Sequence, residues 1–246
     1  MKLIVPMLML LLTITTDALA KDVKVGMGNY EPYYIAKGKT GIFTDVLEAV
    51  FRHMPDHQPV YLFGRPNKRL WRDFKNGKID AVANVFDSAE LEGCKTDPVF
   101  RFRDIATTKT SRGLKIEKIS DLAGLRVVAF QGAKKFMGTE FSTYTDFKVY
   151  TEVANQEQQS AMLHGGRADV SIGDMFLFLQ SLKKLKDRSV KAIDFKFHDI
   201  FPALITRMGF RDASMCPLFN KALAKIISSG DYERVYNSYL TRLGYN

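Results

Sequence analysis

The chain has 246 residues, of which 46% are hydrophobic and 26% charged, so it can bury a sizeable core and is not intrinsically disordered. Its two cysteines exclude a disulfide-rich scaffold and a multi-cysteine zinc site. No apolar run of about 20 residues, the length that spans a membrane, follows residue 20. The net charge of +9 is spread along the chain, and its densest basic cluster, within 183–188, is interrupted by Asp187. This distribution predicts a solvated helix end and no nucleic-acid partner.

The first twenty residues have the pattern of a secretory signal peptide. Lys2 provides a positive start, residues 3–14 are apolar, and residues 18–20 form the small-x-small motif of a cleavage site. An uncleaved anchor helix is the alternative, and it is disfavoured because Asp17 and the cleavage motif follow the apolar stretch so closely. No cysteine lies near the cleavage point, so we expect a periplasmic chain that begins at Lys21 and is not a lipoprotein.

After the signal segment, strand-like and helix-like segments alternate. A helix is expected from Thr44, its predicted N-cap, because apolar residues then recur at helical spacing. A second helix opens at Pro66 and stops at Gly77. In chain order the expected elements are strand 23–27, helix 44–54, strand 60–63, helix 66–77, strand 79–86, strand 126–130, a helix from 133, strand 147–151, helix 155–164, strand 168–172, strand 203–206, helix 217–229 and a last helix capped by Asp231.

Two passages within this order are alike. Residues 76–82 and 165–171 each contain a glycine stop, a base, an apolar residue, an aspartate and the start of a strand. One such passage is common at any helix-to-strand turn, but two at matching places predict two similar α/β lobes. The two C-terminal helices follow a returning strand, so we expect them to pack back on an earlier layer.

Several short motifs carry a resemblance to a known family. They are Tyr30-x-Pro32-Tyr33, Gly41-Ile42-Phe43-x-Asp45-Val46-Leu47, residues 76–81, residues 120–128, Gln131-Gly132, Gly165-x-Arg167-x-Asp169, Asp174, residues 219–223 and Ser229-Gly230. In their order and spacing they resemble periplasmic solute-binding proteins of family 3, the small two-lobed, amino-acid-binding branch associated with ABC importers. The resemblance extends from about residue 21 to residue 243.

This resemblance implies a fold and a division into lobes. The implied fold is the α/β, type II periplasmic binding protein fold, in which each lobe is a mostly parallel sheet flanked by helices and a two-strand hinge joins the lobes. After a signal peptide at 1–20, the first lobe is expected to comprise 21–108 plus 206–246, and the second 109–205. Chain crossings near 105–110 and 202–206 would form the hinge, and ligand would lie between the closing lobes.

The resemblance also implies ligand contacts from both lobes. Tyr30 matches a ring that stacks on the ligand, although it is also interpretable as a loop aromatic over the first strand. Asp174 matches an acid that pairs with a ligand amino group, although a helix N-cap is an equal interpretation. Gln131-Gly132 opens a helix whose free N–H groups suit a carboxylate. The full set of expected ligand-binding residues is Tyr30, Arg69, Phe86, Asp87, Ser88, Gln131, Gly132, Ala133, Lys134 and Asp174.

The first lobe departs from the amino-acid binders at the residue that holds the ligand carboxylate. Those proteins place a Thr and then an Arg after the strand that begins here at Asp80, whereas this chain has Leu91 or Glu92 at the Arg position and no Arg within 81–100. The hydroxyl residue usual after Gly132 is replaced by Ala133. We therefore expect a ligand other than a standard α-amino acid.

Two hypotheses address this departure. Arg69 is a candidate substitute for the missing Arg, the alternative being an ordinary solvated helix residue. Asp87 beside Asp174 would suit a ligand with more than one positive centre, such as a polyamine-like compound. Under the two-lobed interpretation Cys94 and Cys216 both belong to the first lobe, and because the chain is exported we expect them to form a disulfide instead of two separate thiols.

No catalytic or cofactor site is expected. His53 and His57 have helical i,i+4 spacing, but Pro55 interrupts the helix, so no metal site is predicted. The expected function is capture of a small polar solute, amino acid-like or otherwise charged, by a monomer that serves an ABC-type permease. The alternatives are a ligand-sensing module for a membrane receptor and a periplasmic dehydratase of prephenate-like acids, with Glu31 or Asp174 as its acid.

Overall fold

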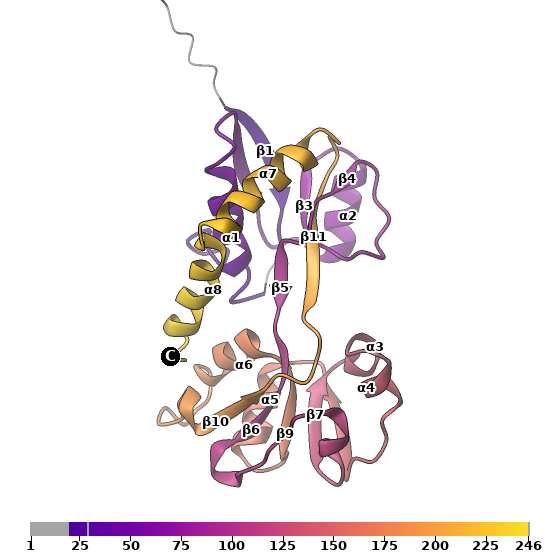
Figure 1. Cartoon of the computed structure of the whole chain (residues 1–246), viewed down its shortest axis with the longest axis vertical. Helices are drawn as coiled ribbons and strands as arrows, with labels where there is room; N and C mark the ends of the chain where they lie inside the picture. Colours follow the sequence, from indigo (N-terminus) through magenta and orange to yellow (C-terminus); the bar gives the residue numbers. More distant parts are fainter. Residues whose placement is uncertain (1–19, 29, 246) are drawn as a thin grey trace, which may run out of the picture.

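The computed structural model describes residues 20–28 and 30–245, with Asn67 described by its backbone alone (Figure 1). The expected signal peptide, apart from Ala20, lies outside the described residues. In the described part of the chain, no helix has both the length and the apolar character needed to cross a bilayer. Within it, too, no group of three or more His, Cys, Asp or Glu side chains is placed to hold a metal ion.

The first lobe is built on a six-stranded sheet in the order β2-β1-β3-β11-β4, with β5 paired to β11. Its strands are β1 (Lys21–Gly26), β2 (His57–Leu62), β3 (Ala81–Val85), β4 (Cys94–Lys95), β5 (Phe100–Phe102) and β11 (Leu204–Phe210). β1, β2 and β3 are parallel, whereas β11 runs antiparallel to its neighbours. The helices of this lobe are α1 (Ile42–Phe51), α2 (Asn67–Lys75), α7 (Met215–Ser228) and α8 (Asp231–Arg242).

The second lobe is built on a five-stranded sheet in the order β10-β6-β9-β7-β8. Its strands are β6 (Asp104–Lys109), β7 (Arg126–Phe130), β8 (Val149–Val153), β9 (Val170–Asp174) and β10 (Phe195–His198). β7, β8 and β9 are parallel, and β6 runs antiparallel to β9 and β10. The helices are α3 (Ala133–Phe136), α4 (Thr139–Thr143), α5 (Glu157–His164) and α6 (Met175–Leu182). Short 3-10 turns lie at Thr110–Arg112, Ile119–Leu122 and Ala192–Asp194.

The chain crosses between the two sheets twice. It leaves the first sheet at Phe102 and enters the second at Asp104, and it returns between His198 and Leu204. β5 and β11 pair antiparallel with each other beside these crossings, and Figure 1 shows the two strands side by side between the upper and the lower lobe. The expected lobe bounds at 108 and 206 differ from this change of sheet by a few residues, because β6 already pairs with β9 from Asp104 onward.

Some helix and strand ends differ from the expected ones. Thr44 is not an N-cap: α1 begins two residues earlier, after Gly41, and the Thr44 hydroxyl, fully buried, donates to the Thr40 carbonyl. Asp231 is likewise the first residue of α8, whose N-cap is Gly230. The observed β8 and β9 each begin two residues after their expected starts, at Val149 and Val170.

A disulfide joins Cys94 and Cys216, as expected, with a Cα–Cα distance of 6.2 Å. It fastens β4, a two-residue edge strand, to α7. The two cysteines are 122 residues apart in the chain, and closing a loop of this size in the unfolded state stabilises the fold by about 4–5 kcal/mol in the chain-entropy model.

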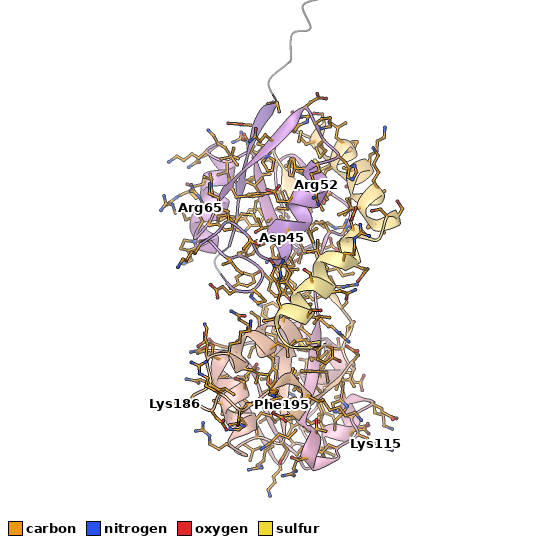
Figure 2. The ribbon with its side chains drawn as sticks, turned by 90° about the vertical axis from the view of Figure 1, so that its left-hand side faces the viewer. Asp45, Arg52, Arg65, Lys115, Lys186 and Phe195 are labelled. Atoms are coloured by element: carbon orange, nitrogen blue, oxygen red, sulfur yellow. A yellow bond between two sulfur atoms is a disulfide. The ribbon has the colours of Figure 1, made fainter. Side chains whose placement is uncertain are left out.

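The hydrophobic core continues from one lobe into the other. Tyr33 and Phe102 of the first lobe lie beside Phe176 of the second, with ring centroids 6.0 Å apart for Tyr33 and Phe176. Tyr236 of α8 contacts the same ring at 6.0 Å. Figure 2 shows α8 running down beside the narrow junction between the lobes. The junction is therefore an aromatic contact as well as a chain crossing.

Candidate ligand site between the lobes

The carboxyl ends of the parallel strands in both sheets point toward the junction. In the first lobe, Val85 at the end of β3 pairs with Arg207 in the middle of β11, the strand by which the chain returns from the second lobe. In the second lobe, Asp174 at the end of β9 pairs with Asp104, the first residue of β6 after the other crossing. The carboxyl edges of the two sheets therefore face each other, and open α/β sheets bind ligands outside such edges.

Asp174 is the most buried acid at this junction, with 5% of its surface exposed. Its Oδ1 accepts from the backbone N–H of Leu177 (2.9 Å), so it is the N-cap of α6, as one of the two interpretations held. Its Oδ2 accepts from the Tyr33 hydroxyl of the opposite lobe (2.6 Å) and from the backbone N–H of Arg103 (2.8 Å). The Asp174 side chain therefore caps helix α6 and also accepts a hydrogen bond from the other lobe.

Asp104 lies directly beside Asp174 in the β6–β9 pair. Burial raises the pKa of both carboxyl groups, and the charge of Asp174 raises the pKa of Asp104 further. Neither carboxylate forms an ion pair with any base among the described residues. The junction thus holds two adjacent acids with no base beside them, and only hydrogen bonds from Tyr33 and the backbone stabilise the charge of Asp174.

Tyr30 lies at the same edge, after β1. Its hydroxyl accepts from the side-chain amide of Asn84 (2.9 Å), and the Asn84 carbonyl oxygen in turn accepts from the Thr206 hydroxyl (2.8 Å). Asn84 has a left-handed φ of 65°, a conformation that Asn adopts more readily than most residues. The Tyr30 ring is half-buried among Tyr34, at 5.1 Å, and the neighbouring aromatic rings of the junction. Asn84 therefore ties the loop after β1, strand β3 and the returning strand together.

In the second lobe, the expected anion donors are occupied by the protein itself. The N–H of Gly132 donates to Glu152 Oε2 (2.8 Å), and the N–H of Lys134 donates to Oε1 (3.2 Å). The Lys134 ammonium donates to the carbonyls of Phe141 (2.9 Å) and Tyr144. It lies about 5 Å from three aromatic ring centroids, those of Phe141, Phe147 and Tyr150. Ala133 is fully buried and Gln131 is exposed. A ligand carboxylate would have to displace Glu152 to use this helix start.

Two charged residues expected to bind ligand in the first lobe, Asp87 and Arg69, also have partners within the protein. Asp87 forms an ion pair with Arg207, which holds the pKa of Asp87 below its usual range, so Asp87 and Asp174 do not combine as a pair of free acids. Arg69 points its guanidinium at Asp73 (3.5 Å), which also pairs with Arg65. Arg69 thus pairs with an acid one turn away in its own helix, as the alternative interpretation of a solvated helix residue expected.

Phe86 and Ser88, the remaining expected contacts, flank Asp87 just beyond β3. Phe86 is 39% exposed, which is high for a large apolar ring, and Ser88 is exposed. Both therefore lie on the accessible carboxyl edge of the first sheet. Phe86 therefore offers an exposed apolar surface at this edge.

Two residues at this site were not anticipated from the sequence. Tyr33 was part of the Tyr30-x-Pro32-Tyr33 motif, but nothing in that motif shows which of the two rings reaches the other lobe. Asp104 lies in the short segment of alternating aromatic and charged residues, 100–104, which carries no chemical signature. The available signal was an acid directly before the apolar and Thr-rich run 105–108.

Comparison with known proteins finds likenesses in structure alone. No family model matches the chain, and no curated protein matches it in sequence. The probable amino-acid ABC transporter extracellular-binding protein ytmK from Bacillus subtilis superposes with a TM-score of 0.70 at 20% identity, over 90% of this chain and 98% of that one. A polar amino acid ABC uptake transporter substrate-binding protein from Streptococcus thermophilus gives 0.66 at 18% identity, over 89% and 85%. The GluR0 ligand-binding core in complex with L-glutamate gives 0.65 at 16% identity, over 91% and 99%.

These likenesses confirm the expected fold. The chain has the two-lobed α/β fold of periplasmic binding proteins, with two sheets flanked by helices. Solved structures with this fold include proteins described as binding proteins of ABC transporters. At these low identities the shared fold does not carry over any ligand.

Proposed function

We propose that this protein is an exported solute-binding protein that closes its two lobes over a small polar solute and delivers it to an ABC-type importer. The observation that carries the proposal is the pair of facing carboxyl edges, with the buried Asp174 of one lobe bonded to Tyr33 of the other. The named roles of the structural neighbours support it. The sequence pattern of the first twenty residues supports export to the periplasm by a cleavable signal.

The charge distribution at the edges supports a ligand that differs from an ordinary α-amino acid. Glu152 occupies the helix start that would receive a carboxylate, and Arg69 faces Asp73. Asp174, by contrast, faces the junction without a base. A protonated nitrogen of the solute would therefore meet no competing base at Asp174, whereas a carboxylate would have to displace Glu152.

The direct test is ligand screening on the mature chain from residue 21, unfolded and refolded with its disulfide intact to remove any solute carried through purification. Thermal unfolding is then followed against amino acids, amines, polyamines and organic acids. A solute at 100 times its dissociation constant stabilises the fold by about 2.7 kcal/mol. We expect such a rise with at least one nitrogen-containing solute, and a smaller radius of gyration in small-angle X-ray scattering when it binds, because the lobes close.

Variants at the junction sharpen this test. Asp174→Asn is expected to weaken binding of that solute by about 10- to 100-fold, as expected when a charge-assisted hydrogen bond is lost. Asp146→Asn, an exposed acid elsewhere in the second lobe, is the matched control and should bind as the parent does. Binding that leaves the radius of gyration unchanged, or that survives Asp174→Asn undiminished, would contradict the proposal.

A further inference from the structure

A second concave site lies at the hinge, and it shares Asp104 and several aromatic rings with the junction described above. It is a cavity of about 310 Å³. One wall comes from β5 and α8 of the first lobe, and the other from α6 and the returning segment 199–203 of the second lobe. None of the ten ligand-binding residues expected from the sequence lines it. Its volume is at the lower end of the range for small-molecule sites, about 300–1,000 Å³.

The charges around this cavity are matched except for one. Arg101 forms a bidentate ion pair with Glu233 (3.1 and 3.0 Å). Arg103 forms another with Asp199 (3.1 and 2.8 Å). The fifth titratable side chain that lines the cavity is Asp104, which forms no ion pair with a described base. Burial and the charge of Asp174 raise the pKa of Asp104 to about 7, so above that pH the cavity has one surplus negative charge.

The remaining wall is aromatic. Phe102, Phe176, Phe201 and Tyr236 line the cavity, and each presents a π system that attracts cations. Tyr236 already shows this chemistry, because the guanidinium of Arg101 lies 4.8 Å from its ring centroid. An uncompensated carboxylate beside aromatic rings selects for a positively charged, partly apolar ligand.

We propose that this hinge cavity binds a small organic ammonium ion, with its charge against Asp104 and its alkyl groups against Phe102, Phe176 and Phe201. The cavity borders the carboxyl edge of the second sheet at Asp104, but it does not include Asp174 or the other residues proposed for the solute site. Because its walls belong to both lobes, its occupant contacts both and favours the lobe arrangement in which those walls face each other.

Tetramethylammonium is a suitable probe, since it has a charge and methyl groups but no hydrogen-bond donor. Isothermal titration of the full mature chain at constant ionic strength measures its binding. Two matched small molecules serve as controls, tert-butanol for shape without charge and acetate for the opposite charge. We expect tetramethylammonium to bind at least tenfold more tightly than either.

Two variants test the location. Asp104→Asn keeps the shape of the side chain and removes its charge, and it should weaken tetramethylammonium binding about tenfold. Phe201→Leu retains apolar volume, removes one ring and should weaken binding about threefold. Asp146→Asn, an exposed acid of the same lobe, should leave binding within twofold of the parent. Circular dichroism checks that each variant folds.

Three results would overturn the proposal. They are no saturable binding of tetramethylammonium, tighter binding of acetate or tert-butanol, and unchanged binding in both Asp104→Asn and Phe201→Leu. The test is independent of the solute screen: a chain that binds no solute at the carboxyl edges refutes the proposed function, and tetramethylammonium binding then still decides the hinge site.

Discussion

A buried aspartate lies at each end of strand β9, and the two differ in their partners and in the direction of their pKa shifts. At the amino end, Asp169 accepts hydrogen bonds from the side chain of Arg126 (3.0 and 2.8 Å) and lies 3.1 Å from Arg112. These arginines, Arg126 first, lower the pKa of Asp169 to about 2. At the carboxyl end, five residues later, Asp174 is equally buried but has no base, and burial raises its pKa.

This contrast assigns fold stability to one edge of the second sheet and ligand binding to the other. A buried acid with two arginines stabilises the fold, because its charge is compensated within the lobe. A buried acid without a base has an energetic cost in the absence of a ligand, and its partners come from the other lobe and from a helix start. We infer that the amino edge of the second sheet maintains the lobe, and that the carboxyl edge is kept ready for a ligand.

The largest predicted effect is at the amino end. Asp169→Asn removes the compensation of two arginines at a side chain that is 7% exposed, and it should lower the free energy of unfolding by about 2–3 kcal/mol. Because the pKa of Asp169 is depressed in the folded state, its contribution is present above the ordinary Asp pKa and is lost as the pH falls toward 2.

Denaturant unfolding at pH 7 and at pH 3 measures both effects. Glu157→Gln, which removes one partner of the exposed Lys184–Glu157 pair, is the control and should cost less than about 1 kcal/mol. An Asp169→Asn variant as stable as the parent at pH 7 would remove the basis of the comparison.

A smaller loss is expected from Tyr33→Phe, which deletes the hydroxyl that crosses the junction to Asp174. The carboxylate then retains only backbone donors, so the free energy of unfolding should fall by about 1–2 kcal/mol. Tyr144→Phe is the control: it removes an exposed hydroxyl that donates to the Ser120 carbonyl, and it should change the free energy of unfolding by less than about 0.5 kcal/mol. Equal melting temperatures for these two variants would mean that the Tyr33–Asp174 contact contributes nothing.

The smallest effect has the opposite sign. Asp104→Asn removes an uncompensated charge, so it should stabilise the fold at pH 8, by an amount on the order of 1 kcal/mol or about 2–4 °C. The pKa of Asp104 is raised in the folded state, so the parent loses stability as the pH rises from the ordinary Asp range through the raised value. The advantage of the variant should vanish near pH 4, which thermal scans across this range would show, and a destabilised variant at pH 8 would contradict the account.

The sequence predicted more of the fold than of the site. The alternation of elements, the repeated Gly-base-apolar-Asp passage and the Cys94–Cys216 pairing depend on local patterns or on lobe membership, and the structure agrees with them. The carboxyl-edge position of Asp174 followed from the family motif. The helix start at Gly132 was correctly placed, but its occupation by Glu152 depends on the register between β7 and β8, which no local pattern encodes.

Contacts between distant segments account for the rest. The Tyr33–Asp174 bond joins residues 141 positions apart, and the pairing of Asp87 with Arg207 joins residues 120 apart. The first depends on how the two lobes meet, and the second on where the chain returns from the second lobe. The sequence analysis did not predict these two contacts because the partners of a charged side chain are set by tertiary packing. In both cases the partner lies far away in the chain.

The most direct test of the central claim compares the two ends of β9 by ligand affinity. The solute found in the thermal screen is titrated calorimetrically into Asp174→Asn and Asp169→Asn, at a temperature where both are fully folded. The account predicts that Asp174→Asn loses about 10- to 100-fold in affinity, whereas Asp169→Asn binds like the parent despite its lower stability. Equal losses in the two variants, or normal affinity in Asp174→Asn, would contradict the claim that the carboxyl edges of the two sheets form the ligand site.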